Sequence, residues 1–108
     1  MALSPVYSTR FFAVEGLLGT QTYTPEAGFV AIVRDIDLYV AVPLLGSISF
    51  FFIGSSGQTI DYYEAGADTT ATHQWRGRQV FTDLDTFSIT VNSSAADVTV
   101  SGYLLTPP

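Results

Sequence analysis

The longest strand-like pattern in the chain covers residues 28–42, where apolar side chains recur at every second position. Successive side chains of a β-strand point to opposite faces, so this spacing predicts one apolar face and one mixed face. The apolar face, expected to lie in a core, comprises Val30, Ile32, Ile36, Leu38, Val40 and Val42. The mixed face comprises Ala31, Val33, Asp35, Asp37, Tyr39 and Ala41.

Arg34 interrupts the apolar face of this segment. Three explanations are open: a bend in the strand, an ion pair with a carboxylate, or a bulge. A bulge would shift the alternation by one residue and exchange the two faces on one side of it.

Shorter segments of strand character follow one another along the chain, separated by turns rich in Gly, Pro, Ser and Asp. They are residues 9–14, 20–24, 28–42, 47–53, 58–63, 72–81, 86–91 and 98–105. Evenly spaced short strands without a helical segment are typical of sandwiches and jelly rolls. We therefore predict an all-β fold: an antiparallel, jelly-roll-like two-sheet β-sandwich of about eight strands. Residues 1–8 are expected to be an N-terminal arm or edge strand, and residues 9–108 a single β-sandwich domain.

Residues 47–53 (SISFFFI) are apolar on both faces of the predicted strand. Ile48, Phe50 and Phe52 share one face, which the core can take. Phe51 and Ile53 lie on the other face, and a domain of this size has little room for a third layer. We therefore regard Phe51 and Ile53 as candidate interface residues. The alternative is a strand buried on both sides within the monomer.

The charge balance limits the possible partners. The net charge is −6, there is no lysine, and the four cations are Arg10, Arg34, Arg76 and Arg78. Nucleic acids and anionic membrane surfaces are bound by clustered positive charge, so neither is expected as a partner. Without cysteine the chain has no disulfide and no thiolate metal site, which fits synthesis in a reducing cytosol. The first residues lack signal-peptide features, and no apolar run reaches the about 18 residues of a membrane span.

The sequence also lacks a recognisable catalytic set. The only histidine, His73, has no ligand spacing with Asp61, Glu64 or Asp68, so it is expected to be structural or solvent-facing. Neither a nucleophile motif nor a phosphate-binding glycine loop is present. We expect a protein that is not an enzyme and that needs no cofactor or metal.

The most distinctive local group is Trp75, Arg76 and Arg78. As a strand, this segment places both arginines on one face and Trp75 with Gly77 on the other, unless Gly77 forms a bulge. Trp and Arg are favoured interface anchors, and Arg binds carboxylates of its own chain or of a neighbouring subunit. All three residues therefore join the candidate interface. In the alternative interpretation, Trp75 lies in the core and the arginines pair with surface aspartates.

Residues 75–105 (WRGRQVFTDLDTFSITVNSSAADVTVSGYLL) resemble small structural proteins of tailed bacteriophages, notably of actinobacterial siphoviruses. A second similar segment lies earlier, and together the two cover about half of the chain. The matching residues are Trp75, Gly77, Arg78, Gln79, Val80, Asp97, Val98, Val100 and residues 101–105, with Pro25, Gly28, Phe29 and residues 33–37 in the earlier segment. The turn after Val80 departs from the family pattern, because this chain has TDLD where a tight Pro-Gly turn is expected.

The resemblance implies a virion component, either a minor tail or tail-tip protein or a capsid decoration protein. It implies a β-sandwich that forms a homo-oligomer, with a trimer as the expected form, and that contacts other virion proteins. Such a protein is made in the cytoplasm of the host bacterium. The alternative function is a carbohydrate-binding β-sandwich for host-surface adhesion, with Trp75 or an exposed tyrosine as a stacking platform.

Overall fold

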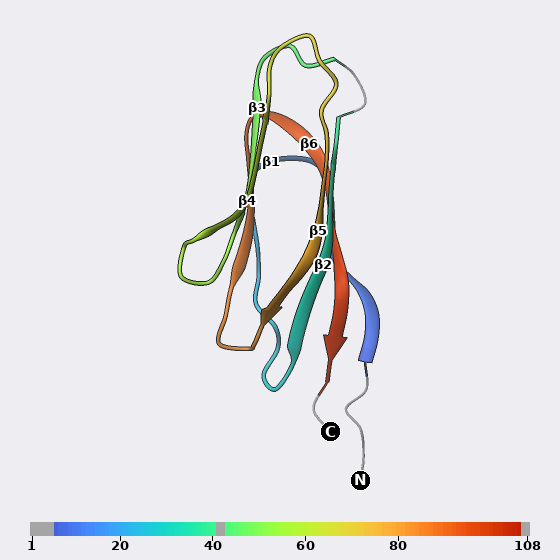
Figure 1. Cartoon of the computed structure of the whole chain (residues 1–108), viewed down its shortest axis with the longest axis vertical. Coiled ribbons are helices and arrows are strands. Elements are labelled where there is room, and N and C mark those ends of the chain that lie inside the picture. The colour runs from blue at the N-terminus through green and yellow to red at the C-terminus, as the bar shows by residue number, and fades with distance from the viewer. Residues whose placement is uncertain (1–5, 41–42, 107–108) are drawn as a thin grey trace.

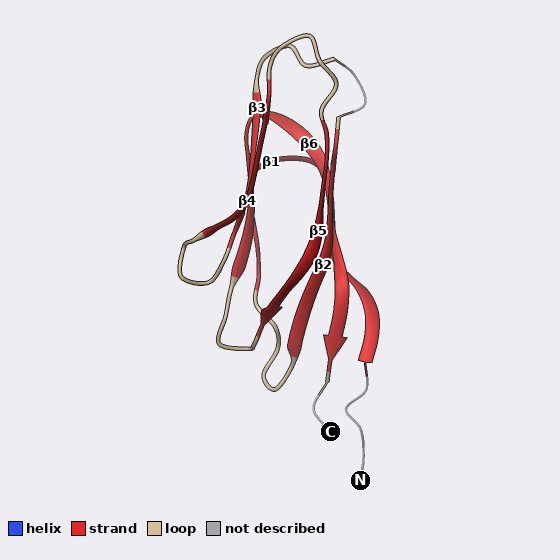
Figure 2. Ribbon diagram, viewed as in Figure 1, coloured by secondary structure: helices blue, strands red, loops and turns tan. Residues whose placement is uncertain are grey.

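The computed structural model describes residues 6–40 and 43–106, and every regular element within them is a β-strand (Figure 2). The six strands are β1 (Val6–Tyr23), β2 (Val30–Tyr39), β3 (Ile48–Ile53), β4 (Thr59–Ala65), β5 (Thr72–Phe81) and β6 (Phe87–Leu105). All strand pairs are antiparallel. The all-β prediction is confirmed. In these residues the structure has no helix that is both long enough and apolar enough to span a membrane.

The strands form one hydrogen-bonded sheet that folds over on itself into a flattened, nearly closed barrel (Figure 1). The order is β4-β3-β6-β2-β5, and β1 pairs with β6. Residues 88–92 of β6 pair with β3, and residues 97–105 pair with β2. We call the first half of the barrel the β3–β4 layer; it includes residues 87–92 of β6 and 19–23 of β1. The β2–β5 layer includes residues 97–105 of β6 and 6–14 of β1.

The expected number of about eight strands is not confirmed, because β1 and β6 each combine two predicted strands. In β1 the pairing register shifts around Leu17, where Gly16 and Gly19 have φ values of 65° and 115°. In β6 the bend contains Ser93, with φ of 77°. Positive φ turns the chain without ending the ladder on either side, and glycine adopts it without steric penalty. The two layers are therefore parts of one continuous sheet, and a jelly-roll-like sandwich of two separate sheets is not confirmed.

The core lies between the two layers and is rich in aromatic side chains. The largest completely buried side chains are Phe50, Phe52, Phe87, Ile36, Leu38, Ile48 and Ile89. Phe87 is the centre of this cluster, since its ring contacts five other aromatic rings at centroid distances of 4.8–6.3 Å. Complete burial of such a side chain contributes about 1.5–3 kcal/mol, so this cluster is a main source of stability.

The irregularity at Arg34 is a bulge, the third of the three explanations. The register of β2 shifts between Val33 and Asp35 against both β5 and β6. Val33 and Ile36 are completely buried, and the two residues between them point outward. The alternation before the bulge therefore runs opposite to the prediction.

The predicted face of residues 28–42 is thus correct for Ile36 and Leu38, which are buried. It is wrong before the bulge, where Ala31 and Val33 face the core and Val30 and Ile32 face outward. The predicted positions of Ala41 and Val42 fall outside the described residues.

Both ends of the barrel are closed by connections that cross between the layers (Figure 1). At one end, Leu44 is buried and its backbone exchanges hydrogen bonds of 2.8 Å with Asp68 and Thr69 of the β4–β5 loop. At the other end, the backbone N–H of Gly28 donates to Asp83 Oδ2 at 2.7 Å. These bonds join the crossing connections to one another at each end of the barrel. Each layer turns one face to the core and one outward.

Candidate interaction surfaces

Phe51 and Ile53 lie on the outer face of the β3–β4 layer. Their neighbours Ile48, Phe50 and Phe52 are at most 1% exposed, whereas Phe51 and Ile53 are half-buried. In the single chain, β3 is therefore buried on one face only. The register places Phe51 between Tyr62 of β4 and Thr90 of β6.

The surroundings of Phe51 are aromatic and hydroxyl-bearing and include one carboxylate, that of Glu64. The rings of Phe51 and Tyr62 are 4.9 Å apart, and the hydroxyls of Thr90 and Thr20 share a hydrogen bond of 2.9 Å. The Tyr62 hydroxyl donates to Glu64 Oε2 at 2.5 Å, and this bond raises the pKa of Tyr62. We call the surface formed by Phe51, Ile53, Tyr62, Glu64 and Thr90 the Phe51 face.

Arg76 lies on the outer face of the β2–β5 layer and pairs with carboxylates of its own chain. Its Nε is 3.2 Å from Asp35 Oδ1, and its Nη2 is 2.9 Å from Asp37 Oδ1. Both aspartates come from β2, next to β5 in the sheet. The three side chains are 44–49% exposed, so each pair contributes only about 0–1 kcal/mol.

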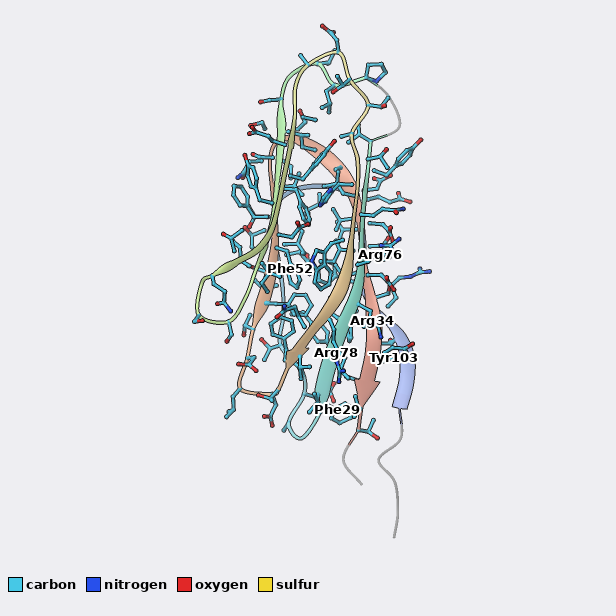
Figure 3. All side chains as sticks on the ribbon, in the orientation of Figure 1. Phe29, Arg34, Phe52, Arg76, Arg78 and Tyr103 are labelled. Atoms are coloured by element: carbon cyan, nitrogen blue, oxygen red, sulfur yellow. The ribbon has the colours of Figure 1, made fainter. Side chains whose placement is uncertain are left out.

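Arg78 and Arg34 lie on the same outer face, nearer the end of β2 and β5 at which Phe29 lies (Figure 3). The guanidinium of Arg34 is 5.9 Å from the centre of the Tyr103 ring, a cation–π distance. Tyr103 pairs with Ile32, and Ile32 pairs with Val80. Val80 is 50% and Tyr103 39% exposed, so an apolar strip lies beside the two arginines.

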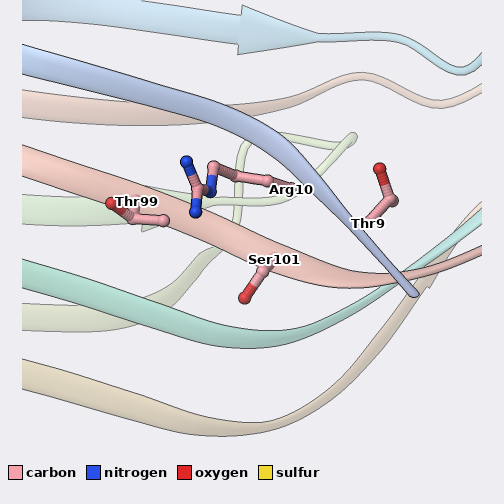
Figure 4. A pocket seen from close by; sticks show the side chains of 4 residues that line it. All are labelled: Thr9, Arg10, Thr99 and Ser101. Carbon is pink, nitrogen blue, oxygen red and sulfur yellow. The ribbon is translucent and has the colours of Figure 1, made fainter.

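Arg10 extends this surface across β1. It pairs with Ser101 of β6, which pairs in turn with Asp35 of β2, so the row runs directly to Arg76. Arg10 lines an open hollow of about 330 Å³ with the hydroxyls of Thr9, Thr99 and Ser101 (Figure 4). We call the surface that carries Arg10, Arg34, Arg76 and Arg78 the Arg face.

Trp75 points to the inner side of β5. Its ring packs edge-on against Phe52 at 5.1 Å and also covers Gly77, where an added Cβ would come within 2.6 Å of the indole. Trp75 and Gly77 therefore share the inner face and the two arginines the outer face, as the strand pattern predicted. Trp75 remains half-buried, because β5 is at the edge of the sheet.

His73 joins the two edges of the sheet. Its Nε2 is 2.6 Å from Asp61 Oδ2, with the side chains 21% and 20% exposed, and its ring stacks on Tyr63 at 4.6 Å. β5 carries His73 and β4 carries Asp61, and no ladder connects these two strands. Side-chain contacts thus close the barrel where backbone pairing does not. Among the described residues, no three His, Cys, Asp or Glu side chains are arranged to hold a metal ion.

The sequence singled out Arg76 and Arg78 but not Arg10 and Arg34 as surface residues of one kind. All four meet on one face only through the register of four strands and the bulge in β2. The sequence offered one signal only: the chain has four cations in total, all of them arginines.

No protein-family model and no curated protein sequence matches this chain. The surfaces described above are therefore the structural basis for inferring a function.

Proposed function

We propose that this chain is a non-enzymatic structural protein of a tailed-phage virion, a minor tail or tail-tip component or a capsid decoration component. It works by assembling through the outer faces of its two layers as a homo-oligomer, with a trimer as the expected form. The observation that carries this proposal is that both outer faces hold apolar side chains that the monomer covers only in part. They are Phe51, Ile53, Tyr62, Val80 and Tyr103.

The composition supports an assembly protein. Only 13% of the residues are charged, against about 25% in an average domain, so a large part of the surface is neutral. Neutral, partly apolar sheet faces are suited to burial against another protein. The resemblance of residues 75–105 to phage structural proteins supplies the setting: a virion, other virion proteins as neighbours, and synthesis in the cytoplasm of a host bacterium.

The non-enzymatic part of the proposal is supported by the surroundings of His73. Its ring is held between Asp61 and Tyr63 at the closure of the barrel, a structural position. The negative net charge and the absence of lysine favour protein partners over nucleic acid or membrane.

We also propose that the two layers correspond to the two sheets of a jelly-roll-like sandwich. In this description, the bends of β1 and β6 divide each strand in two and give eight strand segments. The alternative function is a carbohydrate-binding β-sandwich for host-surface adhesion. Because the ring of Trp75 packs inward on Phe52, the stacking platform would be an exposed tyrosine such as Tyr39 or Tyr62.

Light scattering of the purified protein across a dilution series tests the proposal. We expect a stable mass of about three times the 11.7 kDa of one chain. Phe51→Ser is expected to lower this mass, whereas Leu84→Ser is the matched control, since Leu84 is 91% exposed in a turn away from both faces. A single-chain mass at every concentration would contradict assembly as a homo-oligomer. Binding to a glycan array by such a monomer would favour the adhesion function instead.

A further inference from the structure

The outer face of the β2–β5 layer is balanced in charge. Besides its four arginines it carries Asp35, Asp37 and Asp97. Asp97 belongs to this face because it is exposed and pairs with Tyr39, and paired residues of neighbouring strands point to the same side. Glu15, also exposed, lies beside it, since the following residue, Gly16, contacts Asp97. Four acidic side chains thus stand against four cations, so the charge of this face favours neither an anionic nor a cationic ligand.

Tyr39 is the exposed aromatic residue of this face that no other group covers. Its side chain is 51% exposed at the end of β2. Aromatic rings lie against Tyr23, Tyr62 and Tyr63, and a guanidinium lies against Tyr103. Within residues 6–40 and 43–106, the Tyr39 side chain has no aromatic ring, cation or hydrogen-bond partner of this kind. Its ring is therefore available to pack against a ligand.

Two carboxylates beside Tyr39 are held in place by the fold. Asp97 lies opposite Tyr39 on β6, and its Oδ1 accepts the Gly16 N–H at 2.9 Å. Asp37 precedes Tyr39 by two residues on the same face, and its Oδ1 accepts from Arg76 Nη2 at 2.9 Å. In the part of the chain that the structure describes, neither Oδ2 atom has a hydrogen-bond partner. Each carboxylate thus keeps one oxygen available, in an orientation that its other oxygen fixes.

Hydroxyl and amide groups complete the surroundings of the ring. Thr72 pairs with Tyr39 on the β5 side, and Gln74 pairs with Asp37; both side chains are exposed. On the β6 side Asp37 pairs with Thr99, which lines the open hollow beside Arg10 (Figure 4). Hydroxyl and amide groups both donate and accept hydrogen bonds. The surface around Tyr39 therefore combines an apolar ring with closely spaced donors and acceptors.

We propose that Tyr39 and its polar neighbours bind a neutral sugar unit of a host-surface glycan. One face of a pyranose ring presents C–H groups that pack on an aromatic ring, while the hydroxyls at its edge bond with carboxylate, amide and hydroxyl groups. An apolar contact with a few placed polar groups is the usual composition of a site for a small ligand. This inference rests on the alternative function, host-surface adhesion, and gives it a site. We call this site, formed by Asp37, Tyr39, Thr72, Gln74 and Asp97, the Tyr39 site.

The Tyr39 site is separate from the apolar side chains proposed for assembly. On its own layer these are Val80 and Tyr103. Tyr103 is six residues along β6 from Asp97, the partner of Tyr39, which corresponds to about 20 Å. The Phe51 face belongs to the other layer. The same chain can therefore assemble through those side chains and bind a glycan at the Tyr39 site.

A glycan array of neutral and acidic oligosaccharides tests the site, followed by titration calorimetry with the neutral oligosaccharide that is bound most strongly. Tyr39→Ser removes the ring and is expected to weaken binding about tenfold or more, whereas Tyr39→Phe keeps the ring and should retain most of the affinity. Asp97→Asn keeps an acceptor for Gly16 but removes the charge, and should weaken binding severalfold. Tyr62→Ser is the matched control at an exposed tyrosine of the other layer. Circular dichroism checks that every variant is folded.

The outcomes separate the glycan site from assembly. Silence of the wild-type protein on every neutral glycan, binding to acidic glycans alone, or full affinity in Tyr39→Ser would overturn the Tyr39 site, whatever the mass of the protein. Light scattering of the same samples measures assembly independently, and Tyr39→Ser is expected to keep the wild-type mass. A monomeric wild-type protein that binds the glycan through Tyr39 would contradict the homo-oligomer and support the Tyr39 site.

Discussion

The two layers share the strands β1 and β6 and one core, yet their outer faces differ in chemistry. The β2–β5 layer presents four arginines together with Asp35, Asp37 and Asp97, and the β3–β4 layer presents aromatic and hydroxyl side chains with Glu64. The difference originates in the partner strands, and above all in one register shift. Without the bulge, Arg34 and Asp35 would lie on opposite sides of β2, and one of these charges would face the core. The one residue that β2 has in excess of β6 at the bulge thus places both Arg34 and Asp35 on the outer face.

Adjacent phenylalanines on β3 give the largest expected contrast between an inner and an outer face. Phe52→Ala should lower the free energy of unfolding by about 4 kcal/mol, because it empties a site between Trp75, Phe81 and Phe87. Phe51→Ala, half-buried on the other side, should cost about 1 kcal/mol in dilute protein. Urea unfolding monitored by tryptophan fluorescence measures both. Equal losses would show that the Phe51 face is already covered in the monomer.

Gly102 tests how closely the β2–β5 layer is packed at its bulge. A Cβ at this position would overlap the carbonyl oxygen of Ile32 in the neighbouring strand. Gly102→Ala should therefore destabilise the protein by about 3 kcal/mol, since the backbone must move. Gly66→Ala is the matched control, because nothing lies within 4 Å of its added Cβ and its φ is not positive. A Gly102→Ala protein as stable as the Gly66→Ala control would place β2 and β6 further apart at this level.

The ion pairs of Arg76 are expected to have a smaller effect. Arg76→Gln leaves Asp35 and Asp37 next to each other without a cation, and should cost about 1 kcal/mol at low salt. The cost should shrink at about 1 M salt, where exposed charges are screened. Arg78→Gln, measured in protein dilute enough to be monomeric, should change stability by less than about 0.5 kcal/mol. A larger loss for Arg78→Gln would mean that Arg78 has a partner within the chain.

Two tyrosines of the β3–β4 layer predict a weak dependence on alkaline pH. Burial and then Glu26 raise the pKa of Tyr23 above 10.0, and the hydrogen bond to Glu64 raises that of Tyr62. The folded chain keeps these protons at a pH where the unfolded chain has lost them. The stabilisation is therefore complete below pH 10 and is lost as the pH rises through the folded pKa values. Urea midpoints from about pH 8 to about pH 11 should fall less steeply in Tyr23→Phe/Tyr62→Phe than in the unmodified chain. Parallel curves would contradict these shifts.

The regular strands were predictable from the sequence, and the bent ones were not. The inner and outer faces of β3 follow from simple alternation, because no bulge interrupts residues 49–53 against β6. In β2, alternation alone left three explanations for Arg34. The choice depends on pairing with Ser101 and Gly102, residues more than 60 positions away. Gly16, Gly19 and Ser93 look like turn residues locally, and only their pairing shows that the chain bends there within one ladder.

The candidate surfaces were predictable in part for the same reason. Phe51, Ile53, Arg76 and Arg78 could be assigned to outer faces from alternation within their own strands. That Arg10 and Arg34 join them, and that Asp61 meets His73 across the two sheet edges, depends on contacts between distant segments. The spacing of residues within one strand indicates neither the position of Arg10 and Arg34 nor the contact between Asp61 and His73.

The position of β6 also determines when this chain can fold. β1 is the first of the six strands to be synthesised, and β6, its only partner, is the last. Until β6 leaves the ribosome, β1 has nothing to pair with, and β2 and β3 each lack the neighbour that joins the two halves of the barrel. The nascent chain must therefore carry long apolar strands with open edges, a form prone to aggregate. Pairing between segments so far apart is also slow, because the intervening chain must first be ordered. Once β6 is available, both layers can be completed at once. From then on the chain no longer has the open strand edges that make it prone to aggregate.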